Sequence, residues 1–379
     1  MKEFAEYLSI NKKTGILLLL LFTVMVIFVK NDTFLYKETI AKIISVENEF
    51  SHKEEGPNDE EERYYDQKMT AVILNGKHNG KKLTIRNTYS SSGVNDEKYT
   101  KGDVVFVSPN SSVTSGTITQ KKRDTYIVTL LGIFLFLLFF LNRKHGIMVC
   151  FSLIINLGIF FVSLGKYQQG MDMTGIAFVM MLVFSVLTLL FAGGFHKKTW
   201  VAIAASLVTT MICYGIYEIT LTLNERLPYE MMEYAVNPDD LSDLFLVGIL
   251  MGSLGAVMDV SISITSGVQE ILETSPDISL KALIKSIREM GYDIMGTMIN
   301  VLLFTYISGA IPLVVIKIDN GYTLYHLIHF HLIFEIVRFL MGGIGIVMAI
   351  PVAGFFSVIV LYGKNLRKRK KTTDREQEA

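Results

Sequence analysis

Cysteine is scarce in this chain of 379 residues, because only Cys150 and Cys213 occur and both lie inside long apolar runs. The polar stretch 31–123 contains none, which excludes a disulfide framework there. An excess of one charge is also lacking, since 36 Lys and Arg residues balance 36 Asp and Glu residues. A nucleic-acid partner, which a basic excess would indicate, is therefore not predicted.

Apolar runs, in contrast, are abundant, and half of the residues are hydrophobic. A membrane-spanning helix needs about 20 mostly apolar residues. Eight runs approach that length: 15–29, 125–141, 147–164, 174–192, 200–218, 244–265, 293–316 and 341–362. The first run follows Lys12 and Lys13 and lacks a small-x-small cleavage site, so we expect a retained anchor rather than a signal peptide.

The distribution of basic residues predicts the orientation, because loops on the cytoplasmic side carry the excess of Lys and Arg. With the N-terminus inside, the inner loops hold Arg143, Lys144, Lys197, Lys198, Lys281, Lys285 and Arg288. The outer loops hold only Lys166, Arg226 and Lys317. Eight spans then place both termini, including the basic tail 363–379, in the cytoplasm.

The segment 322–340 is apolar, but three histidines, Glu335 and Arg338 interrupt it. Counted as a full span, it would place the basic tail outside. We therefore expect a re-entrant or interfacial helix here.

Residues 31–123 are expected to form an extracytoplasmic β domain. "ETIAKIISVE", "QKMTAVILN", "KKLTIRNTY" and "GDVVFVS" are short runs rich in β-branched residues, and "NGKHNGK" supplies a turn. Such strands predict an OB-like barrel or a sandwich. The chain is thus predicted to be mainly α, a polytopic helical membrane protein with about eight spans and one small β domain. Its expected parts are an N-terminal tip and anchor (1–30), the β domain (31–123), the helical membrane domain (124–362) and the tail (363–379).

A stripe of small and polar residues runs along the sixth apolar run. It consists of Gly248, Gly252, Gly255, Asp259, Ser263, Ser266 and Glu270, spaced 4, 3, 4, 4, 3 and 4. This spacing puts them on one face of an α-helix. The glycines indicate close helix packing. A carboxylate at membrane depth is a functional candidate, so Asp259 is expected to face another helix or a cavity.

The two following hydrophobic segments show related patterns. Asp293, Gly296 and Asn300 share one helical face. Glu335, Arg338, Gly342 and Gly345 are spaced 3, 4 and 3, and Glu335 and Arg338 are close enough to pair. Helix breaks are predicted at Pro312 and Pro351. His326, His329 and His331 do not share one α-helical face, so neither a metal site nor a cofactor is predicted.

The order of "GSLGAVMDVSISITS", "GYDIMGTMINVLLFTYISGAIPL" and "EIVRFLMGGIGIVMAIP" resembles the YibE/F family of bacterial multi-pass membrane proteins. The resemblance covers roughly residues 125–362. The matching positions are Gly252, Gly255, Asp259, Asp293, Asn300, Pro312, Glu335, Arg338, Gly345 and Pro351. The anchor and β segment fit the longer of two forms in this family. The resemblance implies a bacterial plasma-membrane location and a partner, either a shorter paralogue or a second copy, but no particular activity.

The leading hypothesis is a transporter or export component, not an enzyme, with no catalytic residues. A polar path would be formed by the last three hydrophobic segments, with Asp259, Ser263, Asp293, Asn300, Glu335 and Arg338 along it. Gly248, Gly252, Gly255, Gly342 and Gly345 would pack helices. The plainer reading is that the glycines and the Glu335–Arg338 pair serve packing alone, while Asp259 and Asp293 lie near wet cytoplasmic ends. A Walker A motif is absent, so any drive from ATP would come from another chain.

Two other hypotheses remain. In the first, the chain is a membrane receptor or assembly protein that recognises a partner through its outer β domain. In the second, Asp259 and Asp293 form the aspartate pair of an intramembrane protease. The sequence disfavours a protease, because it has no Gly-x-Gly-Asp motif and "GAVMD" precedes "GYD".

Overall fold

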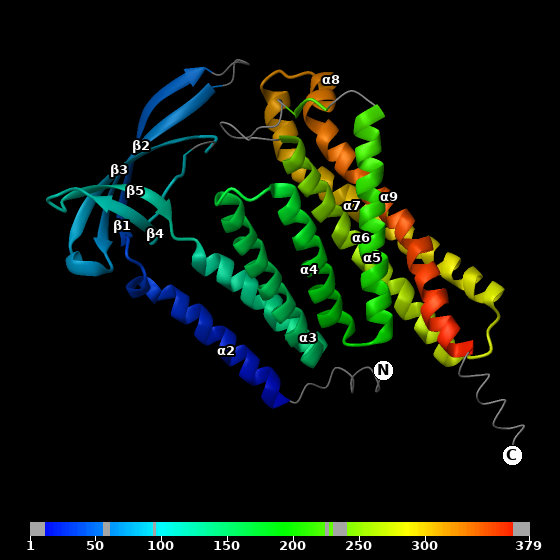
Figure 1. Ribbon diagram of the computed structural model, residues 1–379. Coiled ribbons are helices and arrows are strands. Elements are labelled where there is room, and N and C mark those ends of the chain that lie inside the picture. Colours follow the sequence, from blue (N-terminus) through cyan, green and yellow to red (C-terminus); the bar gives the residue numbers. More distant parts are fainter. Residues whose placement is uncertain (1–11, 56–60, 94–95, 224–226, 230–240, 367–379) are drawn as a thin grey trace, which may run out of the picture. The chain divides into compact units, whose positions relative to one another are not determined.

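The computed structural model describes residues 12–55, 61–93, 96–223, 227–229 and 241–366 (Figure 1). The chain divides into two compact units, Met1–Gly146 and Ile147–Ala379. Because the first unit holds all the strands and the second holds most of the helices, each is described by itself.

The first unit contains a closed five-stranded barrel (Figure 1). The order along the chain is α2 (Lys12–Lys30), η1 (Asp32–Leu35), β1 (Thr39–Glu55), β2 (Glu61–Ile73), η2 (Gly76–His78), β3 (Lys82–Ser90), β4 (Val104–Pro109), β5 (Ser115–Lys121) and the start of α3 (Asp124–Gln168). Around the barrel the strands follow the order β1-β2-β3-β5-β4, and β3 pairs with β5 in parallel while the other pairs are antiparallel. The OB-like barrel is therefore confirmed over the sandwich.

Alternation of apolar and polar residues builds the barrel core. Met69, Ala71 and Ile73 of β2 are fully buried, and Leu83 and Ile85 of β3 face them. Successive side chains of a strand point to opposite faces, so each second residue enters the barrel. This pattern is the one that predicted strands in the sequence.

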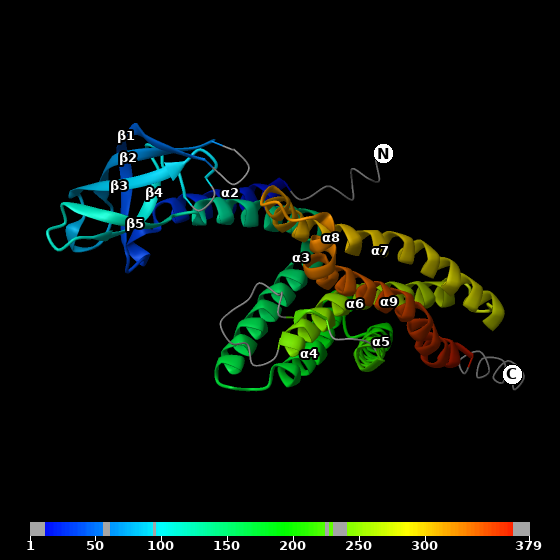
Figure 2. The same cartoon turned by 90° about the horizontal axis from the view of Figure 1, so that it is seen from above.

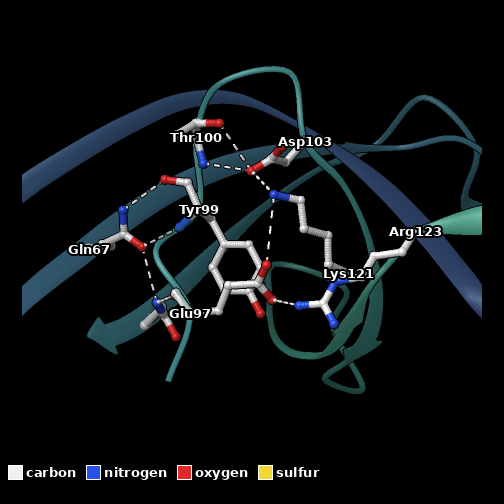
Figure 3. A network of polar contacts seen from close by, with 8 residues as sticks. Gln67, Glu97, Tyr99, Thr100, Asp103, Lys121 and Arg123 are labelled. Carbon is white, nitrogen blue, oxygen red and sulfur yellow. Dashed lines mark hydrogen bonds and ion pairs between the residues drawn. The ribbon is translucent and has the colours of Figure 1, made fainter. Parts of the chain in front are cut away.

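An amide row closes one end of this core. Gln67, which is 1% exposed, pairs with Asn48 on β1 and Asn87 on β3. Its Nε2 donates to Oδ1 of Asn48 (2.8 Å) and to the carbonyl of Tyr99 (2.9 Å). Its Oε1 accepts from Nδ2 of Asn87 (3.0 Å) and from the backbone N–H of Tyr99 (3.0 Å). Figure 3 shows how Gln67 thereby holds the segment around Tyr99 against the sheet.

Charged side chains extend this network to β5. Lys121 Nζ lies 2.9 Å from Oδ2 of Asp103, which also accepts from the backbone N–H of Thr100 at 2.8 Å (Figure 3). Burial acts to raise the pKa of Asp103, but the bonds from Thr100 and Lys121 outweigh it and hold this pKa below the ordinary value. The segment before β4 is therefore fixed from both sides.

The first unit also includes a pair of helical segments, α2 and the start of α3. A Cβ at Gly132 of α3 would clash with Phe22 and Met25 of α2, which shows how closely they pack. At the base of the barrel, Nζ of Lys122 is 2.6 Å from Asp32 and 2.5 Å from Asp124. The compact unit extends to Gly146, so it includes α2 and the first part of α3 together with the barrel.

The second unit is helical. After the remainder of α3 come α4 (Met173–Gly193), α5 (Lys197–Leu223), α6 (Leu241–Thr274), α7 (Leu280–Asp319), α8 (Leu324–His326), the π-helix η4 (Leu327–Leu332), α9 (Ile333–Ser357) and the π-helix η5 (Val358–Tyr362). Six helical stretches of the described chain are long and apolar enough to cross a membrane: 146–168, 173–193, 197–223, 241–274, 280–319 and 324–366. Two shorter apolar helices, 19–30 and 124–140, correspond to the other two predicted runs. The polytopic helical class is confirmed.

Helix α6 lies at the centre of this unit and contacts α4, α5, α7 and α9. Its residues Val257, Val260, Ile264 and Val268 are buried in the largest apolar cluster. Figure 2 shows α7 at the edge of the unit beside α9. The buried residues of α7 all fall near its N-terminal end.

Three predictions about helix ends are corrected. The segment 322–340 does not form a helix of its own, because residues 324–366 form one continuous helical stretch; an interfacial position of its first part stays a prediction. Pro312 does not break α7, which continues to Asp319, and Pro351 does not break α9, which continues to Ser357. A proline removes one backbone donor, but helices that span membranes tolerate this loss, and both helices continue through their prolines.

Candidate intramembrane polar site

The polar stripe of α6 divides into two parts. Gly248 and Gly252 lie against side chains of other helices. From Gly255 onward the stripe opens: a Cβ at Gly255 would meet nothing within 4 Å, and Asp259 and Ser263 are exposed. Gly255 is therefore not a packing glycine within this chain, contrary to the prediction.

The predicted ion pair of α9 is present. Nη1 of Arg338 contacts Oε1 of Glu335, and the two side chains are only 24% and 29% exposed. Both residues point into the same region because they are three positions apart on a helix. Nε of Arg338 is buried and has no hydrogen-bond partner among the described residues. The pair is thus partly buried, and its hydrogen-bonding groups are only partly satisfied.

Helices α6 and α7 complete the site around this pair. A Cβ at Gly248 would lie 3.5 Å from Nε of Arg338, so the missing side chain leaves room for the guanidinium. A Cβ at Gly252 would lie 2.5 Å from the hydroxyl of Tyr306, which comes from α7. Tyr306 is also near enough to interact electrostatically with both Arg338 and Glu335. The two glycines therefore accept one polar side chain from each neighbouring helix.

Aromatic rings form another wall. Cζ of Arg338 is 5.0 Å from the ring centroid of Phe245, a cation–π distance. Phe245 packs edge-on against Phe334 at 5.2 Å, and Tyr229 lies 6.1 Å from both rings. These rings shield the guanidinium from water and strengthen its pairing with Glu335.

The other predicted path residues do not reach this cluster. Asp293 and Asn300 of α7 are exposed, as are Asp259 and Ser263 of α6. Nδ2 of Asn300 donates to the carbonyl of Gly296 on its own helix at 2.7 Å. The six residues therefore fall into two sets: a partly buried ion pair, Glu335 and Arg338, and four exposed groups on α6 and α7.

The glycines of α9 pack as predicted. A Cβ at Gly342 would lie 3.0 Å from Leu302, and one at Gly345 would lie 3.0 Å from Val257 and 3.3 Å from Cys213. Three further close approaches were not predicted: Gly291 against Ile350, Gly354 against Ile287 and Gly267 against Met290. These glycines fall outside the stripes of regular spacing, so the spacing did not indicate them.

The histidine segment adopts π-helical geometry, which the sequence did not indicate. Rings of His326 and His331, five positions apart, come within 5.9 Å, while His329 stacks on Tyr325. A π-helix aligns residues at this spacing. Nε2 of His331 also lies 3.1 Å from Nζ of Lys317 on α7.

Tyr306 is the main residue of the site that sequence reasoning missed. It lies in an apolar run and belongs to no regular polar stripe. A hydroxyl-bearing ring in such a run was the available signal, since a buried tyrosine hydroxyl usually has a polar neighbour.

The fold and site define a multi-pass helical membrane protein that carries a five-stranded barrel and a partly buried ion pair among its last helices. Residues 130–363 match the family described as YibE/F-like protein, and residues 34–121 match the YibE/F family N-terminal domain. The chain belongs to the YibE/F family, as the ordered motifs predicted. No curated protein and no solved structure matches it.

Proposed function

We propose that this chain is a transporter or export component of a bacterial plasma membrane, with both termini in the cytoplasm and the barrel outside. The observation that carries the proposal is the Glu335–Arg338 pair, which lies partly buried where α6, α7 and α9 meet. A pair of this kind contributes little net stability, because the cost of removing its charges from water offsets their attraction. Its place among three membrane helices therefore favours a functional role.

The pair would act as a contact that a proton, cation or substrate opens. Binding of a proton or cation to Glu335 would release Arg338, and binding of an anion to Arg338 would release Glu335. Either event would change the charge and the position of the α9 side chains that lie beside Gly248 on α6 and Tyr306 on α7. Relative movement of these helices is the kind of change that alternating access requires.

The exposed groups Asp259, Ser263, Asp293 and Asn300 support a path shared with another chain. Lipid offers no hydrogen-bond partner to such groups, so at membrane depth they need water or protein. A second copy, or a shorter paralogue of the family, would supply the facing wall.

The test uses the purified full chain in liposomes, with fluxes of protons, Na⁺ and K⁺ followed by entrapped dyes. We expect Asp259→Asn and Glu335→Gln to abolish flux without lowering the melting temperature, because an amide keeps the shape but carries no charge. Glu289→Gln is the matched control, since its carboxylate pairs with Lys285 on an exposed face. Full flux in both variants would contradict the proposal.

The orientation is tested by labelling introduced cysteines from outside intact cells. We expect Lys101→Cys in the barrel to react and Lys370→Cys in the tail to stay protected. The native cysteines Cys150 and Cys213 are buried, which keeps the background low. Labelling of position 370 from outside would contradict the proposed orientation.

A receptor or assembly function is the second candidate, and an aromatic row on the barrel favours it. Phe50, Tyr65 and Tyr89 lie side by side across β1, β2 and β3, next to the amide row. Tyr65 and Tyr89 stack at 5.2 Å, and Phe50 is 57% exposed. Phe50 is thus the exposed end of the row, whereas Tyr65 is half-buried and Tyr89 is buried, and an exposed aromatic side chain supported by packed rings is typical of recognition surfaces. Deleting residues 34–120 while keeping the anchor separates the two functions, because transport would partly survive and recognition would be lost.

A further inference from the structure

A polar cavity of about 530 Å³ lies at the ends of three membrane helices, and neither residue of the ion pair lines it. Its lining includes His196 and Lys197 at the start of α5, Glu273 at the end of α6, and Lys364 and Asn365 after η5. We infer that this cavity binds the phosphate headgroup of an anionic phospholipid.

The position of the cavity places it at a bilayer surface. The start of α5, the end of α6 and the end of the stretch 324–366 are termini of helices that are long enough to span the membrane. Phe195 in the lining is 83% exposed, and Trp200 on the first turn of α5 is 52% exposed. Exposed aromatic residues at helix ends are typical of the membrane–water interface.

The charges of the lining suit one phosphate. Lys197 and Lys364 supply two ammonium groups, and the positive end of the α5 dipole lies at Lys197. Glu273 is the opposing charge, and its Oε1 accepts from Nε2 of Gln269 at 2.7 Å. The cavity therefore carries a net positive charge that a phosphodiester complements.

The apolar part of the lining favours a lipid over free phosphate. Leu272 and Leu361 border the same cavity as the two lysines. A phospholipid offers both a phosphate and hydrocarbon, whereas inorganic phosphate would leave these side chains unused. The sequence that follows directly, Arg367 to Lys371, is wholly basic and would concentrate anionic lipids near the cavity.

The test is native mass spectrometry of the purified full chain with phosphatidylglycerol or phosphatidylcholine. We expect the double variant Lys197→Gln/Lys364→Gln to bind phosphatidylglycerol about tenfold more weakly, with phosphatidylcholine binding unchanged. The control is Lys281→Gln/Lys285→Gln, which removes the same charge from another exposed site and should still bind phosphatidylglycerol. Glu273→Gln should bind phosphatidylglycerol more tightly, since the opposing charge is gone.

Equal losses in the two double variants would overturn the inference, because they would show general surface attraction. Inorganic phosphate that competes with phosphatidylglycerol at equal concentration would likewise overturn the lipid assignment. Melting temperatures in phosphatidylcholine must agree between variants and parent chain. If the glutamine variant unfolds, two other double variants replace it. The inference requires that Lys197→Ala/Lys364→Ala binds phosphatidylglycerol weakly and that Lys197→Arg/Lys364→Arg retains phosphatidylglycerol binding.

Discussion

The barrel and the helical bundle satisfy their buried polar groups in different ways. In the barrel, Gln67 makes four hydrogen bonds to β1, β3 and the segment before β4. In the bundle, the hydroxyls of Ser253 and Thr265 on α6 donate to carbonyls of their own helix. Bonds between elements fix one arrangement, whereas bonds within a helix leave that helix free to shift against its neighbours. The Glu335–Arg338 ion pair is likewise formed within α9, and no hydrogen bond joins it to α6 or α7 among the described residues.

The largest effect is expected where the barrel meets its helices. Lys122, 5% exposed, holds Asp32 and Asp124, so Lys122→Met should lower the free energy of unfolding of this unit by about 3–5 kcal/mol. Hydrogen exchange of the β4 and β5 amides in the full chain measures it. Lys121→Met removes a more exposed pair with Asp103 and should cost about 1 kcal/mol or less. Equal losses of unfolding free energy in Lys122→Met and Lys121→Met would show that the buried pairs of Lys122 add no more stability than the more exposed pair of Lys121.

The amide row gives the next largest effect. Gln67→Leu should cost about 2–3 kcal/mol, because the N–H and carbonyl of Tyr99 would lose their partners in a buried place. The readout is the exchange rate of amides in β1 to β3. Thr88→Val, which removes an exposed bond to Asp66, should change stability by only about 0.5 kcal/mol. If Gln67→Leu left the stability unchanged, hydrogen bonds between elements would not stabilise the barrel more than the bonds within helices stabilise the bundle.

Two glycines of one stripe test the bundle. Gly252→Leu should destabilise it by about 1–3 kcal/mol, because Tyr306 occupies the space that a side chain would need. Gly255→Leu, one turn farther along the same face, meets open space and should be close to neutral in the isolated chain. Thermal unfolding in detergent compares them. Similar melting temperatures would mean that α7 does not approach α6 at Gly252.

The smallest expected effects are changes in the free energy of unfolding of the barrel with pH. The pKa of Asp103 is lowered, so its contribution to stability is present above about pH 4 and is lost as pH falls through its folded pKa. A hydrogen bond to Asp124 raises the pKa of Tyr36 to about 12. Its contribution is therefore complete below about pH 10 and is lost as pH rises toward 12. Tyr36→Phe should remove the alkaline loss in barrel unfolding curves; a loss that persists would belong to another group.

The sequence predicted some pairings better than others. Glu335 and Arg338 were identified because three positions on one helix always bring side chains together. Tyr306 was missed because it reaches the site from another helix, and no spacing within α7 reveals that. The helix breaks at Pro312 and Pro351 were wrong because a proline removes only one backbone hydrogen bond, a loss that long membrane helices tolerate.

By itself, the sequence determined the membrane helices, through the length of its apolar runs, and the barrel strands, through alternation between residues 39 and 121. Both follow from periodicity along one chain segment. Only the tertiary structure decided which parts of a stripe are covered. Helix α7 approaches α6 at Gly252, where Tyr306 occupies the space that a side chain at position 252 would need. It does not do so at Gly255 or Asp259. It approaches α6 again at Gly267 through Met290, so the contact is made at separate positions. The spacing of a stripe defines a helical face, but which positions on that face are covered depends on the side chains of the neighbouring helix.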